Sequence, residues 1–418
     1  MKISIITPSH SLEYINELYN TIITQTYSDW EWIVFLNGSA SKSQLSSTIR
    51  NDKRVKVLKK KLDKDLKGNI GYLKHEAFNC GKGEILVEVD HDDLLTDNCL
   101  ELLHDAFQDP EIGFVYSNNA QLHTSGMNPT PYNPIHGWTY KSYNYKNTEL
   151  LSMNSFKPDA ASMAFVWFMP DHVRAWRKSV YKSIDGHDKT LAVLDDQDLI
   201  TRTYLVTKFK FIDEVLYIYR IHGNNTWLLN VDKIQQETVN IFHKYGYKLA
   251  ERDAELNNLM KVDLGGGIDG RPGYTTIDLM DANINCDLNN GIPLADNSVG
   301  VLNASNLIEH LHDRVKTMSE IHRVVADGGW VMIDVPSTDG RGAFQDPSHA
   351  SYWNVNSFYY YTDKSFARYI RNTTIRFQEF RLETGFQNEW QKALGIVMVR
   401  VWLRVIKSDT RRPHLIKI

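Results

Sequence analysis

The chain has 418 residues, which is too long for one ordinary domain and predicts two or three. Hydrophobic residues make up 42% and charged residues 23%, and the formal net charge of −4 gives no electrostatic case for a nucleic-acid or anionic-membrane partner. No apolar run reaches the ~20 residues of a transmembrane segment, the N-terminus lacks a signal-peptide pattern, and three scattered cysteines fit neither a disulfide framework nor zinc spacing. We therefore expect a cytoplasmic protein.

The N-terminal part alternates between short apolar runs and segments of helical spacing. Strands are predicted at Lys2–Thr7, Trp32–Leu36, Arg54–Leu58 and Glu84–Val89, and helices at Leu12–Thr24 and Asn69–Cys80. This alternation predicts a parallel sheet wound with helices, in which ligands bind at the carboxyl ends of the strands. We expect three strand ends to converge on one crevice: Thr7-Pro8-Ser9, Asn37-Gly38 and Asp90–Asp93.

The densest signal in the chain is EILVEVDHDD at Glu84–Asp93. A buried strand here would deliver Asp90, Asp92 and Asp93 into the crevice, where they repel one another unless a hard cation lies among them. The pattern favours a divalent metal held against a nucleoside diphosphate. The alternative is a solvated acidic turn that caps a helix starting near Thr96.

From Met1 to about Trp227 the sequence resembles the inverting family 2 glycosyltransferases of GT-A fold. The matching stretches, in order, are ISIITPSHS, QTYSDWEWIVFLNGS, GNIGYLKHEAFNCGKGEILVEVDHDD, WRKSVYKSIDGHD, VLDDQDLITR and YRIHGNNT. The resemblance implies a nucleotide-sugar donor, a UDP-sugar being expected, a divalent metal (Mn or Mg) and a glycan acceptor. It also implies that Thr7, Pro8 and Ser9 border the base and that Asn37 contacts it.

The same resemblance assigns residues around the diphosphate. Asp90 would lie near the ribose, Asp92 would bind the metal, and His222 matches a position that often binds it too. Lys74 falls where the family commonly has an arginine near the diphosphate, and Asn37 stands where aspartate is common. Lysine lacks the bidentate geometry of arginine, and asparagine offers both a donor and an acceptor.

Sugar transfer also needs a base for the acceptor hydroxyl. Asp195 and Asp196 in VLDDQDLITR match the acidic pair that the family places before a helix. We predict Asp196 as the base, with Asp195 second. Aspartate is also favoured at helix N-caps, so capping of a helix at Gln197–Val206 is the alternative.

Residues Gln121–Lys157 are predicted to be an irregular loop over the sheet. Its aromatic side chains suit stacking on sugar rings or ordinary packing: Tyr132, Trp138, Tyr140, Tyr143 and Tyr145. A helix is predicted at Val231–Leu259, with an increasingly charged second half that is typical of a connector. The predicted domains are residues 1–228 and 258–418, joined by a connecting helix at 229–257.

The run Gly265–Gly270 contains G-x-G-x-x-G, the spacing of a dinucleotide site. Such a site needs a helix directly after the glycines, with its N-terminus facing the pyrophosphate. Arg271-Pro272-Gly273 instead leads at once into a predicted strand at Tyr274–Leu279, so the pyrophosphate would lose its cradle. A ligand that lacks phosphates could still use the glycine turn.

Residues Lys261–Pro336 resemble class I S-adenosylmethionine-dependent methyltransferases of Rossmann-like fold. The resemblance rests on VDLGGG, TTIDLMDANINCDLNNGIPLADNSVGVLNASNLIEHL and EIHRVVADGGWVMIDVP. It implies that Gly265 and Gly267 pass the methionine part, Asp278 holds the ribose hydroxyls and Asp287 lies near the adenine. Residues after the fourth strand would face cofactor or substrate: Asn306, Glu309 and His310.

Methyl transfer to a hydroxyl needs a base, whereas the sulfonium cofactor is already reactive. His349 or Asp346, in a loop beyond the fifth strand, is the predicted base, although a loop of this composition can also be a simple turn. Two alternating apolar segments near the C-terminus, Thr374–Leu382 and Leu394–Ile406, predict final antiparallel strands.

The sequence thus predicts an α/β protein of two domains, a metal-dependent inverting glycosyltransferase of GT-A fold followed by a methyltransferase that O-methylates a sugar. Two alternatives stay open. The second domain could be a non-catalytic module for glycan binding or assembly, or Gly265–Gly270 could serve a nicotinamide-dependent sugar-nucleotide oxidoreductase.

Overall fold

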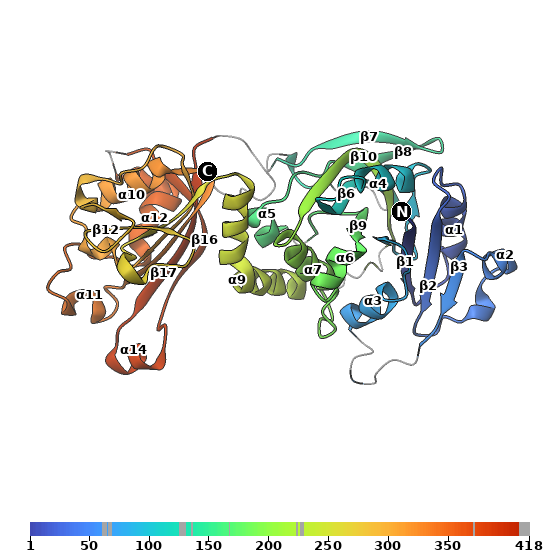
Figure 1. Cartoon of the computed structure of the whole chain (residues 1–418), viewed down its shortest axis with the longest axis horizontal. Coiled ribbons are helices and arrows are strands. Elements are labelled where there is room, and N and C mark those ends of the chain that lie inside the picture. Colours follow the sequence, from blue (N-terminus) through green and yellow to red (C-terminus); the bar gives the residue numbers. More distant parts are fainter. Residues whose placement is uncertain are drawn as a thin grey trace. The chain divides into compact units, whose positions relative to one another are not determined.

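The computed structural model describes residues 1–60, 65, 69–124, 131–134, 137–166, 168–222, 225, 230–370 and 373–408. The chain forms two compact units, Met1–Gly246 and Tyr247–Ile418, each built on its own sheet with helices packed against it (Figure 1). Both units are α/β, as predicted. None of the helices within these ranges is long and apolar enough to cross a bilayer.

The sheet of the first unit begins with four parallel strands in the order β3-β2-β1-β4. They are β1 (Ile3–Ser9), β2 (Trp30–Leu36), β3 (Val55–Leu58) and β4 (Ile85–Glu88). Every residue of β2 and β4 is buried, which is why these strands read as continuous apolar runs rather than alternating ones. The predicted wound sheet is confirmed in this part, and its carboxyl edge carries Asn37 and Asp90–Asp93.

Beyond β4 the sheet becomes mixed and continues β9-β6-β10-β5. These strands are β5 (Leu94–Leu95), β6 (Ile112–His123), β9 (Arg174–Arg177) and β10 (Lys208–Ile221). Strand β9 runs antiparallel to both β4 and β6, and β10 runs parallel to β6. The α-helices that precede α9 (Val231–Leu256) among the described residues of this unit are α1 (Ile15–Ile23), α2 (Ser47–Asn51), α3 (Ile70–Phe78), α4 (Cys99–Ala106), α5 (Ala160–Phe165), α6 (Lys178–Ser183) and α7 (Asp195–Tyr204).

The predicted irregular loop at Gln121–Lys157 is wrong over much of its length. Residues 140–153 form a hairpin of β7 (Tyr140–Tyr145) and β8 (Thr148–Met153), and β8 pairs with β6. The two residues between the strands, Lys146 and Asn147, both have positive φ, as a tight hairpin turn requires. Residues 125–130 and 135–136 of the predicted loop lie outside the described residues.

The helix predicted at Val231–Leu259 is present as α9 (Val231–Leu256), and the division between the two units falls within it. The proposed limits of the domains stay a prediction.

The sheet of the second unit has the strand order β13-β12-β11-β14-β15-β17-β16. The strands are β11 (Met260–Leu264), β12 (Thr275–Asp278), β13 (Ile284–Asn285), β14 (Val299–Ser305), β15 (Val325–Pro336), β16 (Arg376–Gly385) and β17 (Met398–Ile406). The first five in the spatial order are parallel, with the reversal of strand order typical of doubly wound sheets, and β17 is antiparallel to both neighbours. This confirms the predicted antiparallel strands at the C-terminal end.

The helices of the second unit are α10 (Arg314–Val324), α11 (Gly342–Gln345), α12 (Val355–Thr362), α13 (Lys364–Ala367) and α14 (Glu389–Leu394). Between β11 and β12, where every residue is described, the chain makes a single 3-10 turn at Gly267–Asp269 and no α-helix. A pyrophosphate would therefore find no helix N-terminus at the glycine run, as the sequence predicts.

Candidate active site

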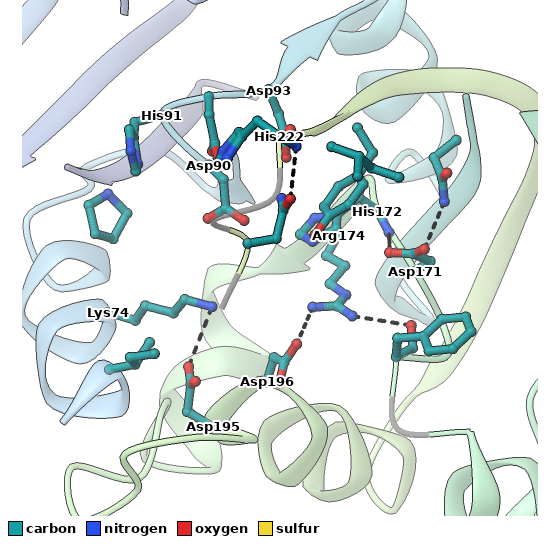
Figure 2. Close-up of a pocket in the computed structure, with 18 of the residues that line it drawn as sticks. Lys74, Asp90, His91, Asp93, Asp171, His172, Arg174, Asp195, Asp196 and His222 are labelled. Carbon is teal, nitrogen blue, oxygen red and sulfur yellow. Dashed lines mark hydrogen bonds and ion pairs between the residues drawn. The ribbon is translucent and has the colours of Figure 1, made fainter. Parts of the chain in front are cut away.

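The first unit contains a cavity of about 520 Å³ at the carboxyl ends of its parallel strands (Figure 2). It brings together eight of the predicted site residues: Pro8, Asn37, Lys74, Asp90, Asp92, Asp195, Asp196 and His222. These residues come from segments far apart in the sequence, and they meet because parallel strands present their carboxyl ends at one edge of the sheet.

Two predicted residues, Thr7 and Ser9, do not line this cavity. Thr7 is fully buried, and its hydroxyl accepts a hydrogen bond from the indole N–H of Trp32 at 3.0 Å. Ser9 donates its hydroxyl to the carbonyl of Ser11 at 2.6 Å. Of the predicted trio only Pro8 faces the cavity, because side chains alternate along a strand.

The three aspartates after β4 have different environments. Asp93 is fully buried and accepts hydrogen bonds from the Tyr217 hydroxyl and the Arg220 backbone N–H, each at 2.7 Å, so it ties β10 to this turn. Asp92 lies 2.8 Å from Nε2 of His222. Burial, with repulsion from Glu88 and Asp92, raises the pKa of Asp90 to about 7 against the opposing effect of Lys74.

The cavity lining is strongly acidic. Seven of its residues are Asp or Glu and two are Lys or Arg, the acidic ones being Glu13, Asp90, Asp92, Asp93, Asp171, Asp195 and Asp196. So many carboxylates in a partly buried space are unfavourable without compensating positive charge. The carboxylate and imidazole donors of Asp92 and His222 therefore fit a divalent cation.

Lys74 lies close to two buried carboxylates. Its Nζ is 2.5 Å from an oxygen of Glu88 on β4, and it is 3.5 Å from an oxygen of Asp195 on α7, the contact drawn in Figure 2. Burial raises the pKa of Asp195 to about 7 although Lys74 opposes this, whereas Lys74 and Arg174 outweigh burial at Glu88 and lower its pKa. Lys74 thus lines the cavity, but its positive charge already compensates the negative charges of Glu88 and Asp195.

Asp196 is the more accessible member of the acidic pair, with 22% of its side chain exposed against 4% for Asp195. Its Oδ2 accepts a hydrogen bond from Nη1 of Arg174 at 2.6 Å, and its Oδ1 accepts one from the backbone N–H of Gln197. Burial acts to raise the pKa of Asp196, but Arg174 and Lys74 outweigh it and hold that pKa below its usual value.

Neither aspartate is the N-cap that the alternative interpretation required. Helix α7 begins at Asp195, and the residue before it, Leu194, has φ of 57°. Both aspartates therefore lie in the first turn, where negative charge interacts favourably with the helix dipole. The position explains local stability, yet it leaves the side chain of Asp196 directed at the cavity.

Sequence reasoning missed Arg174 and Asp171. Arg174, the first residue of β9, is 2% exposed and also donates to the carbonyls of Phe168 and Pro170. Asp171 lines the cavity and accepts hydrogen bonds from Asn119 and from the His172 backbone N–H. One signal was available: an arginine inside a buried strand must find a negative partner.

In the second unit, the predicted cofactor residues gather at the carboxyl ends of β11 and β12. Gly265 and Gly267 both have positive φ, and a Cβ on Gly267 would lie 3.4 Å from Oδ2 of Asp278 at the end of β12. Leu279 and Met280, which follow Asp278, are 64% and 66% exposed. This edge therefore offers a tight glycine turn, a carboxylate and apolar side chains close together.

The other predicted residues of this unit are placed as follows. Asp287 caps the 3-10 turn at Leu288–Asn290 by accepting from the Asn289 backbone N–H, so its carboxylate has a structural role. Asn306 follows β14 with φ of 50°. Asp346 is held by Ser348, and its pKa is lowered mainly by the Ser348 hydroxyl. His349 lies near Glu309, whose pKa burial raises to about 7.

An acidic cavity at the ends of parallel strands is typical of enzymes that bind a nucleotide together with a metal ion. Residues 4–181 match the family model for glycosyl transferase family 2, and residues 271–333 match that of a methyltransferase domain. The chain therefore contains a family 2 glycosyltransferase domain of GT-A-like fold followed by a methyltransferase domain, as the sequence motifs predict.

Curated relatives include a chondroitin synthase of Pasteurella multocida, 24% identical over 235 residues, which are 55% of this chain and 22% of that protein. The glycosyltransferase GlyG of Streptococcus pneumoniae is 25% identical over 58% of this chain and 78% of its own length. The chain thus spans about a fifth of the chondroitin synthase. Among solved structures, S. aureus TarS in complex with UDP has 18% identity and a TM-score of 0.40, covering 58% of this chain and 72% of that chain.

Replacing Lys74 by Met should destabilise the first unit by about 3 kcal/mol or more, because it leaves Glu88 and Asp195 buried without their shared cation. Burial raises the pKa of Asp195 to about 7 even against Lys74, so without Lys74 this pKa rises further and the folded state binds more protons than the unfolded state. Stability of the variant should therefore fall as pH rises above about 3.9, the unperturbed value for aspartate.

Urea unfolding at about pH 5 and about pH 8 measures this. The control is Lys82→Met at an exposed lysine, which should leave stability nearly unchanged. Equal stability of the two variants at both pH values would show that Lys74 does not compensate the buried acids.

Proposed function

We propose that the first unit transfers a sugar from a nucleotide-sugar donor to a glycan hydroxyl, with inversion at the anomeric carbon. The observation that carries the proposal is that the cation donors Asp92 and His222 and the carboxylate of Asp196 open into the same cavity. The names of several relatives, among them chondroitin and hyaluronan synthases, support a glycan as acceptor.

The donor would lie across the carboxyl ends of β1, β2 and β4. Pro8 and Asn37 would contact the base, for which uracil is expected, and Asp90 would accept from the ribose. A divalent cation, Mn²⁺ or Mg²⁺, held by Asp92 and His222 would neutralise the charge of the departing diphosphate. Lys74 contributes by keeping Asp195 and Glu88 in place rather than by a charge reserved for the diphosphate.

We propose Asp196 as the base that accepts the proton of the attacking hydroxyl, with Asp195 as the second candidate. Asp196 is exposed to the cavity, and Arg174 fixes its orientation through Oδ2. Asp195 has a pKa better matched to neutral pH, but its carboxylate is almost fully buried beside Lys74. Access decides in favour of Asp196, because a base must reach the proton it removes.

The substitution Asp196→Asn should lower kcat for manganese-dependent hydrolysis of the preferred UDP-sugar about 100- to 10,000-fold, with little change in KM for the donor. Release of UDP over a panel of UDP-sugars is the measurement. Asp195→Asn should retain more activity, and Asp105→Asn, at an exposed position on α4, should retain all of it. Full turnover by Asp196→Asn would refute the assignment.

The pH profile of kcat separates the two aspartates independently. With Asp196 as base, kcat at saturating Mn²⁺ and donor should stay constant as pH falls to about 5, because the lowered pKa keeps the carboxylate ionised. With Asp195 as base, kcat would instead decline below about pH 7. Saturation with metal and donor is essential, since Asp90 also has a pKa of about 7.

For the second unit we propose O-methylation of a sugar with S-adenosylmethionine as methyl donor. Gly265 and Gly267 would pass the methionine part, and Asp278 would accept from the ribose hydroxyls beside the exposed Leu279 and Met280. The cofactor supplies the methyl group. Tethering the two units would raise their effective concentration for a shared glycan.

Two alternatives differ from this proposal in what the second unit binds. A non-catalytic glycan-binding module would not bind S-adenosylmethionine. A nicotinamide-dependent enzyme would bind NAD at Gly265–Gly270, but the 3-10 turn there offers no helix N-terminus for the pyrophosphate.

Calorimetry on the full chain should show S-adenosylmethionine binding that Asp278→Ala weakens about tenfold or more, because a charged hydrogen bond to the ribose is lost. The matched control is Asp296→Ala, an exposed aspartate on the amino side of β14, which should bind normally. No binding by the unaltered chain would favour the non-catalytic module, and binding of NAD instead would favour the oxidoreductase.

A further inference from the structure

The second unit contains a buried carboxylate that has no hydrogen-bond partner. Glu309, in the 3-10 turn at Ile308–His310 that follows β14, is 2% exposed. Neither of its carboxylate oxygens has a hydrogen-bond partner. An isolated negative charge in such a position is energetically costly, so a proton or a positively charged ligand would stabilise the carboxylate of Glu309.

Two histidines next to Glu309 offer further atoms that can bind a metal ion. When one such side-chain atom is taken from each of Glu309, His310 and His349, the three atoms lie within 4.8 Å of one another. The rings of the two histidines meet edge to face, with centroids 5.0 Å apart. His349 is almost fully buried, with 6% of its side chain exposed.

The hydrogen bonds of the histidines leave ring nitrogens available for a ligand. Nδ1 of His349 lies 2.9 Å from the carbonyl of Ala343. Because a carbonyl only accepts, Nδ1 carries the proton and Nε2 keeps its lone pair. Nδ1 of His310 lies 3.3 Å from the carbonyl of Ser348 and 3.1 Å from its hydroxyl, and because that hydroxyl donates its proton to Asp346, Nδ1 of His310 is again the donor. Metal-binding histidines in proteins are typically oriented by a hydrogen bond of this kind.

The backbone fixes this arrangement without help from a ligand. The carbonyl of Glu309 accepts hydrogen bonds from the N–H groups of Ala350 and Ser351, both at 2.8 Å. The hydroxyl of Ser351 donates to the carbonyl of Ile308 at 3.0 Å. The loop that carries His349 is therefore fastened to the turn that carries Glu309 and His310, and the three side chains are held close together.

We propose that Glu309, His310 and His349 bind a divalent transition-metal ion, with Zn²⁺ as the expected ion. Imidazole and carboxylate are typical zinc ligands, and three protein ligands leave a position for water or a substrate oxygen. The proposal does not depend on methyl transfer, because binding of the metal can be measured without any substrate. It also gives His349 a role different from the predicted base.

The experiment uses the full-length chain without a histidine tag and with Asp92→Ala, which removes a proposed cation ligand of the first unit. After incubation with zinc and desalting, metal analysis should find about one zinc per chain. Adding Glu309→Gln or His349→Ala should abolish most of this zinc. The matched control His312→Ala changes an exposed histidine two residues from His310 and should retain it.

A second measurement uses Co²⁺ in place of zinc, since histidine coordination gives a visible absorption band. The band should appear in the Asp92→Ala chain and be lost with His349→Ala, while circular dichroism in EDTA shows that the variant is folded. If Glu309→Gln or His349→Ala fails to fold, His310→Ala at the partly exposed ligand replaces it. Absence of zinc from the Asp92→Ala chain, or equal zinc in the ligand variants and the control, would overturn the proposal.

Discussion

The first unit is organised by an excess of negative charge at the carboxyl edge of its sheet. Three of the acids there are paired with cations of the protein: Lys74 lies close to Glu88 and Asp195, and Arg174 binds Asp196. Asp93 is satisfied by hydrogen bonds from β10. Asp90 and Asp92 also line the cavity, but neither Lys74 nor Arg174 forms an ion pair with them. A bound cation would compensate their negative charge.

This division of charge also separates the chemical tasks. The proposed base must be ionised and accessible: the ion pair with Arg174 lowers the pKa of Asp196, and 22% of its side chain is exposed. In the proposed reaction the leaving diphosphate would need positive charge near Asp92 and His222. Since Lys74 is shared by two buried carboxylates, it would not compete with the proposed metal ion for a diphosphate. The lysine at a position where arginine is common in the family is therefore compatible with a structural role.

The sequence predicts the strand ends of this site well because an apolar run followed by aspartates or asparagine marks the carboxyl edge of a parallel sheet. The sequence does not predict which side chains of a strand face the cavity. Thr7 and Ser9 point away from it and Pro8 lines it, and a fully buried strand shows no alternation of polar and apolar residues from which this could be inferred. Arg174 was missed because its partner, Asp196, is on a helix more than twenty residues away and only tertiary packing brings them together. The hairpin at 140–153 was missed because β7 (YKSYNY) has no aliphatic residue, although Leu150 and Met153 of β8 are buried.

The second unit applies the same principle with different donors. Glu309 follows β14 as Asp90 follows β4, and in both places burial raises the pKa of a carboxyl group to about 7. The proposed cation donors beside Asp90 are the carboxylate of Asp92 and the imidazole of His222, within a cavity rich in carboxylates that suits a hard cation able to bind phosphate. The neighbours of Glu309 are two imidazoles oriented by backbone carbonyls, a set that suits zinc. Because the type of ligand atom favours one metal over another, the two proposed sites, which follow β4 and β14, would bind different ions. Each unit would then bind its own ion independently of the other.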